Sequence, residues 1–265
     1  MNSENDTKKH ETTGREISET DLKLLKEASG GDERLLQEYI EKRRGGYPVE
    51  YLLQRLEFRG REFFVDPSVY ITDGELSFLV EVVVGWCQKR KSTRDGGVKI
   101  AEIGIGCGSL AVSVLLEEPR VEIVGLEIDA NAKRVLDRNL QRYGVAERVE
   151  VLVSDLFAEW GERDVPECIY GDPPWGDYDS VYGDDRPIEH YLTMPRHTVF
   201  PEGGRTGLHE RILEEVGRLG WKTQIFLNCG VLPDEDLKRL CQMVPGNADL
   251  LQGPEGIHVL SVQTD

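Results

Sequence analysis

The sequence is short of cysteine and has no long apolar run. Its five cysteines are odd in number and scattered, and no two of them form a C-x-x-C pair. This pattern argues against a disulfide framework and against a zinc site, and it favours free thiols in a reducing compartment, so we expect a cytoplasmic protein. No apolar run approaches the ~20 residues that cross a bilayer. The first ten residues are polar and lack the apolar core of a signal peptide.

Positive charge is also scarce, with 32 lysines and arginines against 49 aspartates and glutamates and a formal net charge of −17 at pH 7. A chain this acidic is repelled by nucleic acid at long range, so nucleic-acid binding is not expected. Metal binding is not expected either. Four of the five histidines, which lack metal-ligand spacing, are expected in loops or on the surface: His190, His197, His209 and His258.

The sequence does have a glycine-rich turn between an apolar strand and a helix. Residues 98–103 form a strand-like apolar run that carries Glu102 near its end, and residues 110–116 form a helix-like run. Between them lie Gly104, Gly106 and Gly108. A buried strand, a glycine turn and a helix start in this order are typical of the first βα unit of a nucleotide-binding α/β fold. The glycines allow backbone N–H groups to approach a ligand closely.

The spacing of these glycines distinguishes two classes of cofactor. The dinucleotide fingerprint is G-x-G-x-x-G, whereas this chain has G-x-G-x-G and carries Ser109 where the third dinucleotide glycine would stand. Glu102 would repel a pyrophosphate, but it would attract a cation such as the sulfonium and α-amine of S-adenosylmethionine. The turn resembles that of class I methyltransferases, and this resemblance implies S-adenosyl-L-methionine as the cofactor.

A second and longer signature covers residues 43–71. Residues 56–58 and 62–65 are expected to form a hairpin joined over Arg59-Gly60-Arg61. The segment R-R-G-G-Y-P-V-E-Y-L-L-Q-R-L-E-F-R-G-R-E-F-F-V resembles the linker hairpin of the HemK/PrmC family, the protein-glutamine N5-methyltransferases. The family pattern is similar to R-R-x-G-x-P-x-x-Y-L-x-G-x-x-E-F-x-G-x-x-F-x-V. Where the family continues with I-P-R-P-x-T-E, this chain has Ile71-Thr72-Asp73-Gly74-Glu75, and its N-terminal helical region is shorter by roughly half.

An alternation of strand-like and helix-like segments predicts an α/β fold. The expected strands are residues 98–103, 121–126, 149–153, 168–171, 223–228, 248–251 and 257–263, the last two forming a hairpin. This is the seven-stranded, Rossmann-like architecture of class I methyltransferases. The predicted division of the chain is a disordered tail (1–17), a short helical cap (18–54), a linker β-hairpin (55–72) and the S-adenosylmethionine-dependent methyltransferase domain (73–265).

Carboxylates at the strand ends complete the predicted cofactor site, because ligands of open α/β sheets bind outside the C-terminal ends of the strands. Glu127 follows the second strand and can accept both hydroxyls of a ribose. Asp155 follows the third strand and is expected to accept from the adenine amino group, with Leu156 or Phe157 flanking the ring. The predicted cofactor-binding residues are Glu102, Gly104, Gly106, Cys107, Gly108, Glu127, Ile128, Asp155, Leu156 and Asp172.

Asp172-Pro173-Pro174-Trp175 carries the predicted chemistry. It resembles the [N/D]-P-P-[Y/F/W] motif of methyltransferases that alkylate a planar nitrogen. The nitrogen's N–H groups need acceptors before its lone pair can point at the methyl group, and Asp172 and the Pro173 carbonyl would supply them. The two prolines make the turn rigid, and Trp175 offers a flat face to a planar acceptor. All four residues are predicted to be catalytic.

The sequence leaves the methyl acceptor open. The family mostly has Asn at the position of Asp172, and an ionised Asp cannot donate to an amide as Asn does. Asp177, Asp179, Asp184 and Asp185 follow, and they form either a solvated loop or a rim that attracts a cationic amine or guanidinium. The predicted substrate-contacting residues are Asp172, Trp175, Asp177 and Asp179.

The leading hypothesis is an N-methyltransferase, monomeric or homodimeric, that acts on a glutamine-like side-chain amide. One alternative is an N-methyltransferase of a small amino or guanidino metabolite. Further alternatives are an adenine-N6 methyltransferase of nucleic acids, a non-catalytic cofactor-binding partner protein and a nucleotide-dependent oxidoreductase. The last of these is disfavoured by the Asp-Pro-Pro-Trp turn.

Overall fold

The structure is a computed structural model that describes residues 16–90, 97–177, 186–243 and 246–264. Most of the predicted N-terminal tail lies outside these ranges, as do Asp179, Asp184 and Asp185 of the predicted acidic loop. Within the described ranges, no helix is both long and apolar enough to span a membrane.

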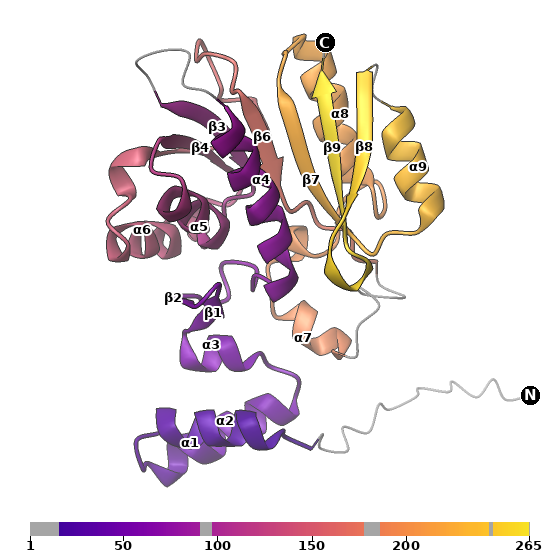
Figure 1. Cartoon of the computed structure of the whole chain (residues 1–265). Coiled ribbons are helices and arrows are strands. Elements are labelled where there is room, and N and C mark those ends of the chain that lie inside the picture. Colours follow the sequence, from indigo (N-terminus) through magenta and orange to yellow (C-terminus); the bar gives the residue numbers. More distant parts are fainter. Residues whose placement is uncertain (1–15, 91–96, 178–185, 244–245, 265) are drawn as a thin grey trace, which may run out of the picture.

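Short helices form the N-terminal part of the described chain: α1 (Glu19–Ala28), α2 (Glu33–Arg44) and α3 (Val49–Leu53). The first two begin at side chains that cap them, because Ser18 accepts from the N–H of Asp21 and Asp32 accepts from the N–H groups at the start of α2. In Figure 1, α1 and α2 lie side by side at one end of the molecule, away from the sheet. The division into cap, linker and catalytic domain stays a prediction.

The linker forms a hairpin of β1 (Leu56–Phe58) and β2 (Arg61–Phe63), which pair antiparallel. Its turn residues Arg59 and Gly60 both have positive φ, 50° and 67°, as a tight two-residue turn requires. The second strand ends two residues earlier than predicted. The reason is that the backbone N–H and carbonyl of Phe64 bond to the side chain of Asn139 instead of to β1.

The predicted seven-stranded sheet is confirmed. Its strand order is β5-β4-β3-β6-β7-β9-β8, and β9 is antiparallel to both of its neighbours while the other pairs are parallel. The strands are β3 (Val98–Ile103), β4 (Val121–Glu127), β5 (Val149–Val153), β6 (Cys168–Gly171), β7 (Gln224–Gly230), β8 (Gly246–Gln252) and β9 (His258–Thr264).

Helices cover both faces of this sheet (Figure 1). One core cluster joins the sheet to α4 (Ser77–Lys89), α5 (Ser109–Glu117) and α6 (Lys133–Arg142), and a second joins it to α8 (Gly207–Leu219) and α9 (Asp234–Gln242). The remaining helix, α7 (Ile188–Leu192), lies between β6 and β7 in the chain. Because the strand order reverses at β3, a crevice forms beside its carboxyl end, where ligands of such sheets bind.

Asn139 on α6 ties the linker to the glycine turn. Its side chain is fully buried. Nδ2 donates to the carbonyl oxygens of Phe64, at 2.9 Å, and Cys107, at 2.8 Å, while Oδ1 accepts from the N–H of Phe64 at 2.8 Å. One side chain therefore satisfies backbone groups of two segments that are far apart in the sequence.

We expect Asn139→Leu to lower the free energy of unfolding by ~3 kcal/mol, since it leaves buried backbone groups of Phe64 and Cys107 without partners. Urea unfolding at pH 7 measures this loss. Gln141→Leu, at an exposed position of the same helix, is the control and should change stability by no more than about 0.5 kcal/mol. Equal unfolding midpoints for the two variants would contradict the role given to Asn139.

Candidate active site

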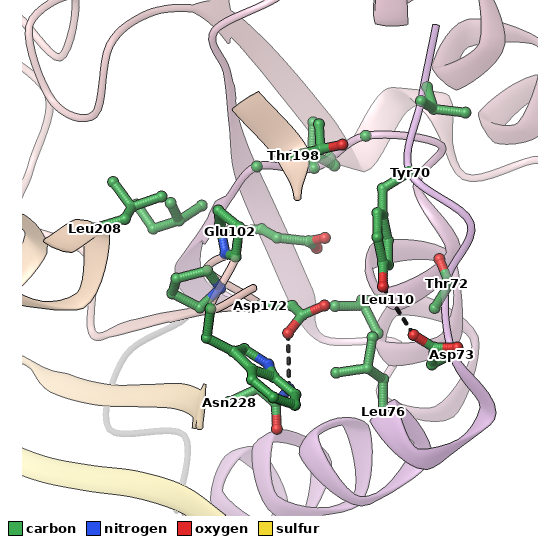
Figure 2. A pocket seen from close by; sticks show the side chains of 18 of the residues that line it. Tyr70, Thr72, Asp73, Leu76, Glu102, Leu110, Asp172, Thr198, Leu208 and Asn228 are labelled. Carbon is green, nitrogen blue, oxygen red and sulfur yellow. Dashed lines mark hydrogen bonds between the residues drawn. The ribbon is translucent and has the colours of Figure 1, made fainter. Parts of the chain in front are cut away.

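A cavity of about 1080 Å³ opens where β3, β4 and β6 end. Figure 2 shows that its walls come from segments far apart in the chain, with Tyr70 to Leu76 facing Glu102 and Asp172. All of the predicted cofactor-binding residues line the cavity except Gly108, and so do all four residues of the Asp172–Trp175 motif. The fold therefore brings the glycine turn and the Asp-Pro-Pro-Trp motif to one cavity.

The glycine turn has the backbone geometry that its sequence requires. Gly104, Gly106 and Gly108 have φ of 66°, 50° and 81°. A residue with a side chain would be strained at these backbone angles. The N–H of Gly106 donates to Oε2 of Glu127 at 2.9 Å, so it holds a side chain as well as shaping the turn. Gly108 is the N-cap residue just before α5, and a Cβ there would lie 2.6 Å from Cδ1 of Leu136. Close packing against α6 explains the glycine at this position.

Glu127 is held in place before any ligand binds. It is buried, and its Oε1 accepts from the N–H of Asp129 at 3.0 Å while Oε2 accepts from Gly106. Each oxygen keeps a second lone pair for a hydroxyl group. Next to it, Ile128 lines the cavity with 53% of its surface exposed, and Leu156 lines it as well. A carboxylate beside apolar side chains suits a ribose with an attached base.

Glu102 is a buried carboxyl at the end of β3. Only 1% of it is exposed, and the hydroxyl of Tyr170 donates to its Oε2. Burial raises the pKa of Glu102 to about 8; the Tyr170 hydrogen bond lowers it, and the charge of Glu127 raises it. A cation beside this group would stabilise its ionised form. A buried carboxyl at the cavity wall therefore fits the sulfonium or α-amine of S-adenosylmethionine.

Asp155, Leu156 and Phe157 follow β5, where the adenine site is predicted. Both oxygens of Asp155 accept from Nη2 of Arg211 at 2.9 Å, at the half-exposed rim of the cavity. Phe157 is absent from the cavity wall and packs edge-on against Trp160 and Trp221, with ring centroids 6.0 and 4.8 Å away. Of the two residues predicted to flank the base, Leu156 is therefore the one that lines the cavity, and its contact with a base stays a prediction.

Asp172 follows β6, and its carboxylate is fixed on one side. Oδ1 accepts from Nδ2 of Asn228, on β7, at 2.7 Å (Figure 2). Burial raises the pKa of Asp172 to about 7; the Asn228 hydrogen bond lowers it, and the charges of Asp73 and Glu75 raise it. Asp172 therefore titrates near neutral pH, whereas an ordinary aspartate is fully ionised there.

Trp175 completes the motif by lying against the end of β7. Gly230 has a φ of 47°, and a Cβ there would lie 2.2 Å from Cζ2 of Trp175. A glycine is therefore needed for the indole to occupy this place. The ring lines the cavity together with Pro173 and Pro174, and it offers a flat face on which a planar acceptor would stack.

Several residues of the site were missed from the sequence. Asp73 accepts from the hydroxyl of Tyr70 at 2.9 Å and from Nη1 of Arg186 at 2.8 Å, and all three residues line the cavity together with Glu75 and Asn228. The available signal was the Thr72–Glu75 stretch, where the chain departs from the family pattern. Conversely, the predicted substrate residue Asp177 does not line the cavity and lies 4.0 Å from Arg205.

Two histidines expected in loops or on the surface are instead buried in helices. They are His190 in α7 and His209 in α8. Burial lowers the pKa of His209 to about 4. The neutral ring bonds through Nε2 to the carbonyl oxygen of Asn228 at 2.8 Å. Among the residues that the structure describes, no three or more His, Cys, Asp or Glu side chains are grouped to hold a metal ion.

Known proteins similar to this chain are methyltransferases. Residues 88–181 match the Methyltransferase small domain family. The release factor glutamine methyltransferase of Bordetella pertussis is 33% identical over 134 residues, which cover 51% of this chain and 47% of that protein. The protein of the same name from Bacillus subtilis is 27% identical over 221 residues, or 81% of this chain and 73% of that one. The resemblance to HemK/PrmC-type methyltransferases is confirmed.

The chain spans only part of the first of these relatives, 47% of the Bordetella pertussis protein. It spans 34% of the bifunctional methyltransferase of Rickettsia prowazekii, to which it is 26% identical. Two solved structures share the fold at 14% identity: the hMettl16 catalytic domain in complex with MAT2A 3′UTR hairpin 6 (TM-score 0.56, 76% of this chain and 74% of that one) and the human methyltransferase 10 domain containing protein (0.54, 77% and 88%). The fold is that of class I methyltransferases.

Proposed function

We propose that this chain is an S-adenosylmethionine-dependent N-methyltransferase that acts on the side-chain amide of a glutamine in a protein. The observation that carries the proposal is the meeting of two sets of residues in one cavity. Glu102, Glu127 and the glycine turn form the cofactor side, and the Asp172–Trp175 motif forms the acceptor side. The relatives named release factor glutamine methyltransferase supply the acceptor class. A cytoplasmic setting and a monomeric or homodimeric state belong to the same proposal.

The residues of the acceptor side would work by orienting a nitrogen. The cofactor, when bound, supplies an electrophilic methyl group on a sulfonium. Oδ2 of Asp172 and the carbonyl of Pro173 accept the two N–H bonds of the amide, which turns the nitrogen lone pair toward the methyl carbon. A nitrogen that gains a methyl group must lose one of its protons, and Oδ2 of Asp172 would take that proton. A pKa near 7 suits a carboxylate for this task at neutral pH.

The same geometry leads to a pH dependence. Because its raised pKa leaves Asp172 protonated below about 7, the carboxyl group there already carries a proton and cannot take the one that the nitrogen loses. We therefore expect kcat to rise with pH and to level off above about 7. Initial rates between pH 5.5 and 9 at saturating cofactor measure this rise of kcat with pH. A rate that falls as the pH rises through this range would contradict the role of an ionised Asp172 in taking hydrogen from the nitrogen.

A second acceptor class is favoured by the acidic wall opposite Asp172. Asp73 and Glu75 line the cavity, and their charges raise the pKa of Asp172. Carboxylates grouped in this way attract a cationic amine or guanidinium. Labelled S-adenosylmethionine, incubated with the enzyme and a cell extract that is then split into protein and small-molecule fractions, separates the two classes. The proposal predicts label in protein at glutamine. Label confined to small amines would replace it with the second class.

A further inference from the structure

The side chain of Asn228 has a fixed orientation. Its Oδ1 accepts from the backbone N–H of Gly230 at 3.2 Å, so its Nδ2 is the atom that faces Asp172. The strand end that carries it is itself held, since the carbonyl oxygen of Asn228 bonds to Nε2 of the buried His209 at 2.8 Å. Asn228 is only 4% exposed. Position 172 therefore always meets a hydrogen-bond donor from β7.

This donor decides which side-chain atom of residue 172 is left to bind the substrate that receives the methyl group. With Asp172, Oδ1 bonds to Asn228, and Figure 2 shows the other carboxylate oxygen pointing across the pocket toward the side of Asp73. With an asparagine at position 172, the amide oxygen would bond to Asn228 and the NH₂ group would face the pocket. An NH₂ group cannot accept an N–H bond from the methyl acceptor.

We propose that Asn228 is a positioning residue, and that Asp172 and Asn228 form a matched pair in which the donor on β7 makes an aspartate necessary after β6. The inference rests on the proposed function, because it concerns the atom that receives the acceptor's N–H bond. It also accounts for the aspartate that this chain has where the resembling family mostly has asparagine. An asparagine at position 172 would serve only if residue 228 became an acceptor.

The groups around Asp172 agree with this assignment. Asp73 and Glu75 face it from the Thr72–Leu76 segment and raise its pKa, and Arg186 bonds to Asp73. On β7, Cys229 is buried and its thiol pKa is raised to about 12, and His209 behind the strand has a lowered pKa, so both are neutral near pH 7. Asn228 is then the group that favours the ionised carboxylate by direct hydrogen bonding.

The test is an exchange of the two side chains in the full chain, assayed on a purified release factor. Asp172→Asn should lower kcat/KM by about 100-fold or more, with the affinity for S-adenosylhomocysteine unchanged within about 2-fold. The double variant Asp172→Asn with Asn228→Asp should regain about 10-fold of that loss, because the carboxylate now on β7 accepts from the NH₂ group of the introduced asparagine and turns that asparagine's oxygen to the pocket. The recovery is partial because an asparagine orients the nitrogen but does not take its proton. Asp249→Asn, which removes one charge at an exposed position of β8, should match wild type.

Two results would overturn the pairing: full activity of the single Asp172→Asn variant, or no recovery in a double variant that folds and binds S-adenosylhomocysteine. A second readout does not need turnover. The side-chain NH₂ resonances of Asn228, identified by their loss in Asn228→Asp, should titrate with Asp172 in wild type and stay constant in Asp172→Asn. If wild type methylates no acceptor, the proposed function fails, and this titration still decides whether the pair exists; constant resonances in wild type would refute it.

Discussion

Replacing Asp172 with alanine should abolish nearly all turnover, by about 10³-fold in kcat, while the affinity for S-adenosylmethionine stays within about 2-fold of wild type. The variant loses the oxygen that orients the acceptor nitrogen and takes its proton. This interaction strengthens in the transition state, so its loss falls on kcat. The carboxylate bonds to Asn228 rather than to the glycine turn or Glu127, which is why cofactor binding is spared.

Single-turnover rates and calorimetry with S-adenosylhomocysteine measure the two quantities separately. Asp249→Ala, at an exposed position of β8, is the matched control for loss of an aspartate. Turnover of the Asp172→Ala variant at the wild-type rate would remove the catalytic role of the motif. It would also favour the alternative in which the chain binds the cofactor as a non-catalytic partner of another protein.

Replacing Glu127 with alanine should weaken binding of S-adenosylmethionine by about 3 kcal/mol, or roughly 100-fold. Two effects add. The hydroxyls of a ribose lose their acceptor, and the N–H groups of Gly106 and Asp129, which now bond to Glu127 at 2.9 and 3.0 Å, lose their partner. The glycine turn is therefore loosened together with the loss of a direct contact.

Calorimetry on the purified variant measures this loss, with Glu122→Ala as the control. Glu122 is an exposed glutamate on the same strand, so its removal changes net charge equally and should leave the affinity unchanged. We also expect that wild type does not bind NAD, because the buried carboxyl of Glu102 favours a cation beside it and not a pyrophosphate. Tight binding of NAD to wild type would contradict the cofactor site described above. So would a Glu127→Ala variant that binds S-adenosylmethionine as tightly as wild type.

Much of the fold was predictable because its signals are local. The apolar runs that become β3 and β4, and the glycines between β3 and α5, each report on a few neighbouring residues. The strand ends then place Glu102, Glu127 and Asp172 at one edge by topology alone. These three residues lie around one cavity because of the strand order, although they are far apart along the chain.

The rest of the site depends on contacts between distant segments. Asn228 and Asp172 are 56 residues apart, and Arg186 and Asp73 are 113 apart. No periodicity reports on such pairs. The same holds for Phe157, which packs on Trp221 instead of facing the cavity, and for Asp172, whose pKa is raised mainly by burial. Side-chain direction and desolvation are set by tertiary packing, which a strand-and-helix pattern does not contain.

In the proposed function, one cavity holds both the cofactor and a glutamine side-chain nitrogen. Tandem mass spectrometry of a purified release factor, after incubation with this protein and methyl-labelled S-adenosylmethionine, tests it most directly. We expect one labelled methyl group on the side-chain nitrogen of a glutamine, and we expect no label when the Asp172→Ala variant replaces wild type. A label on another residue type, or an unlabelled release factor beside a labelled small amine, would contradict it.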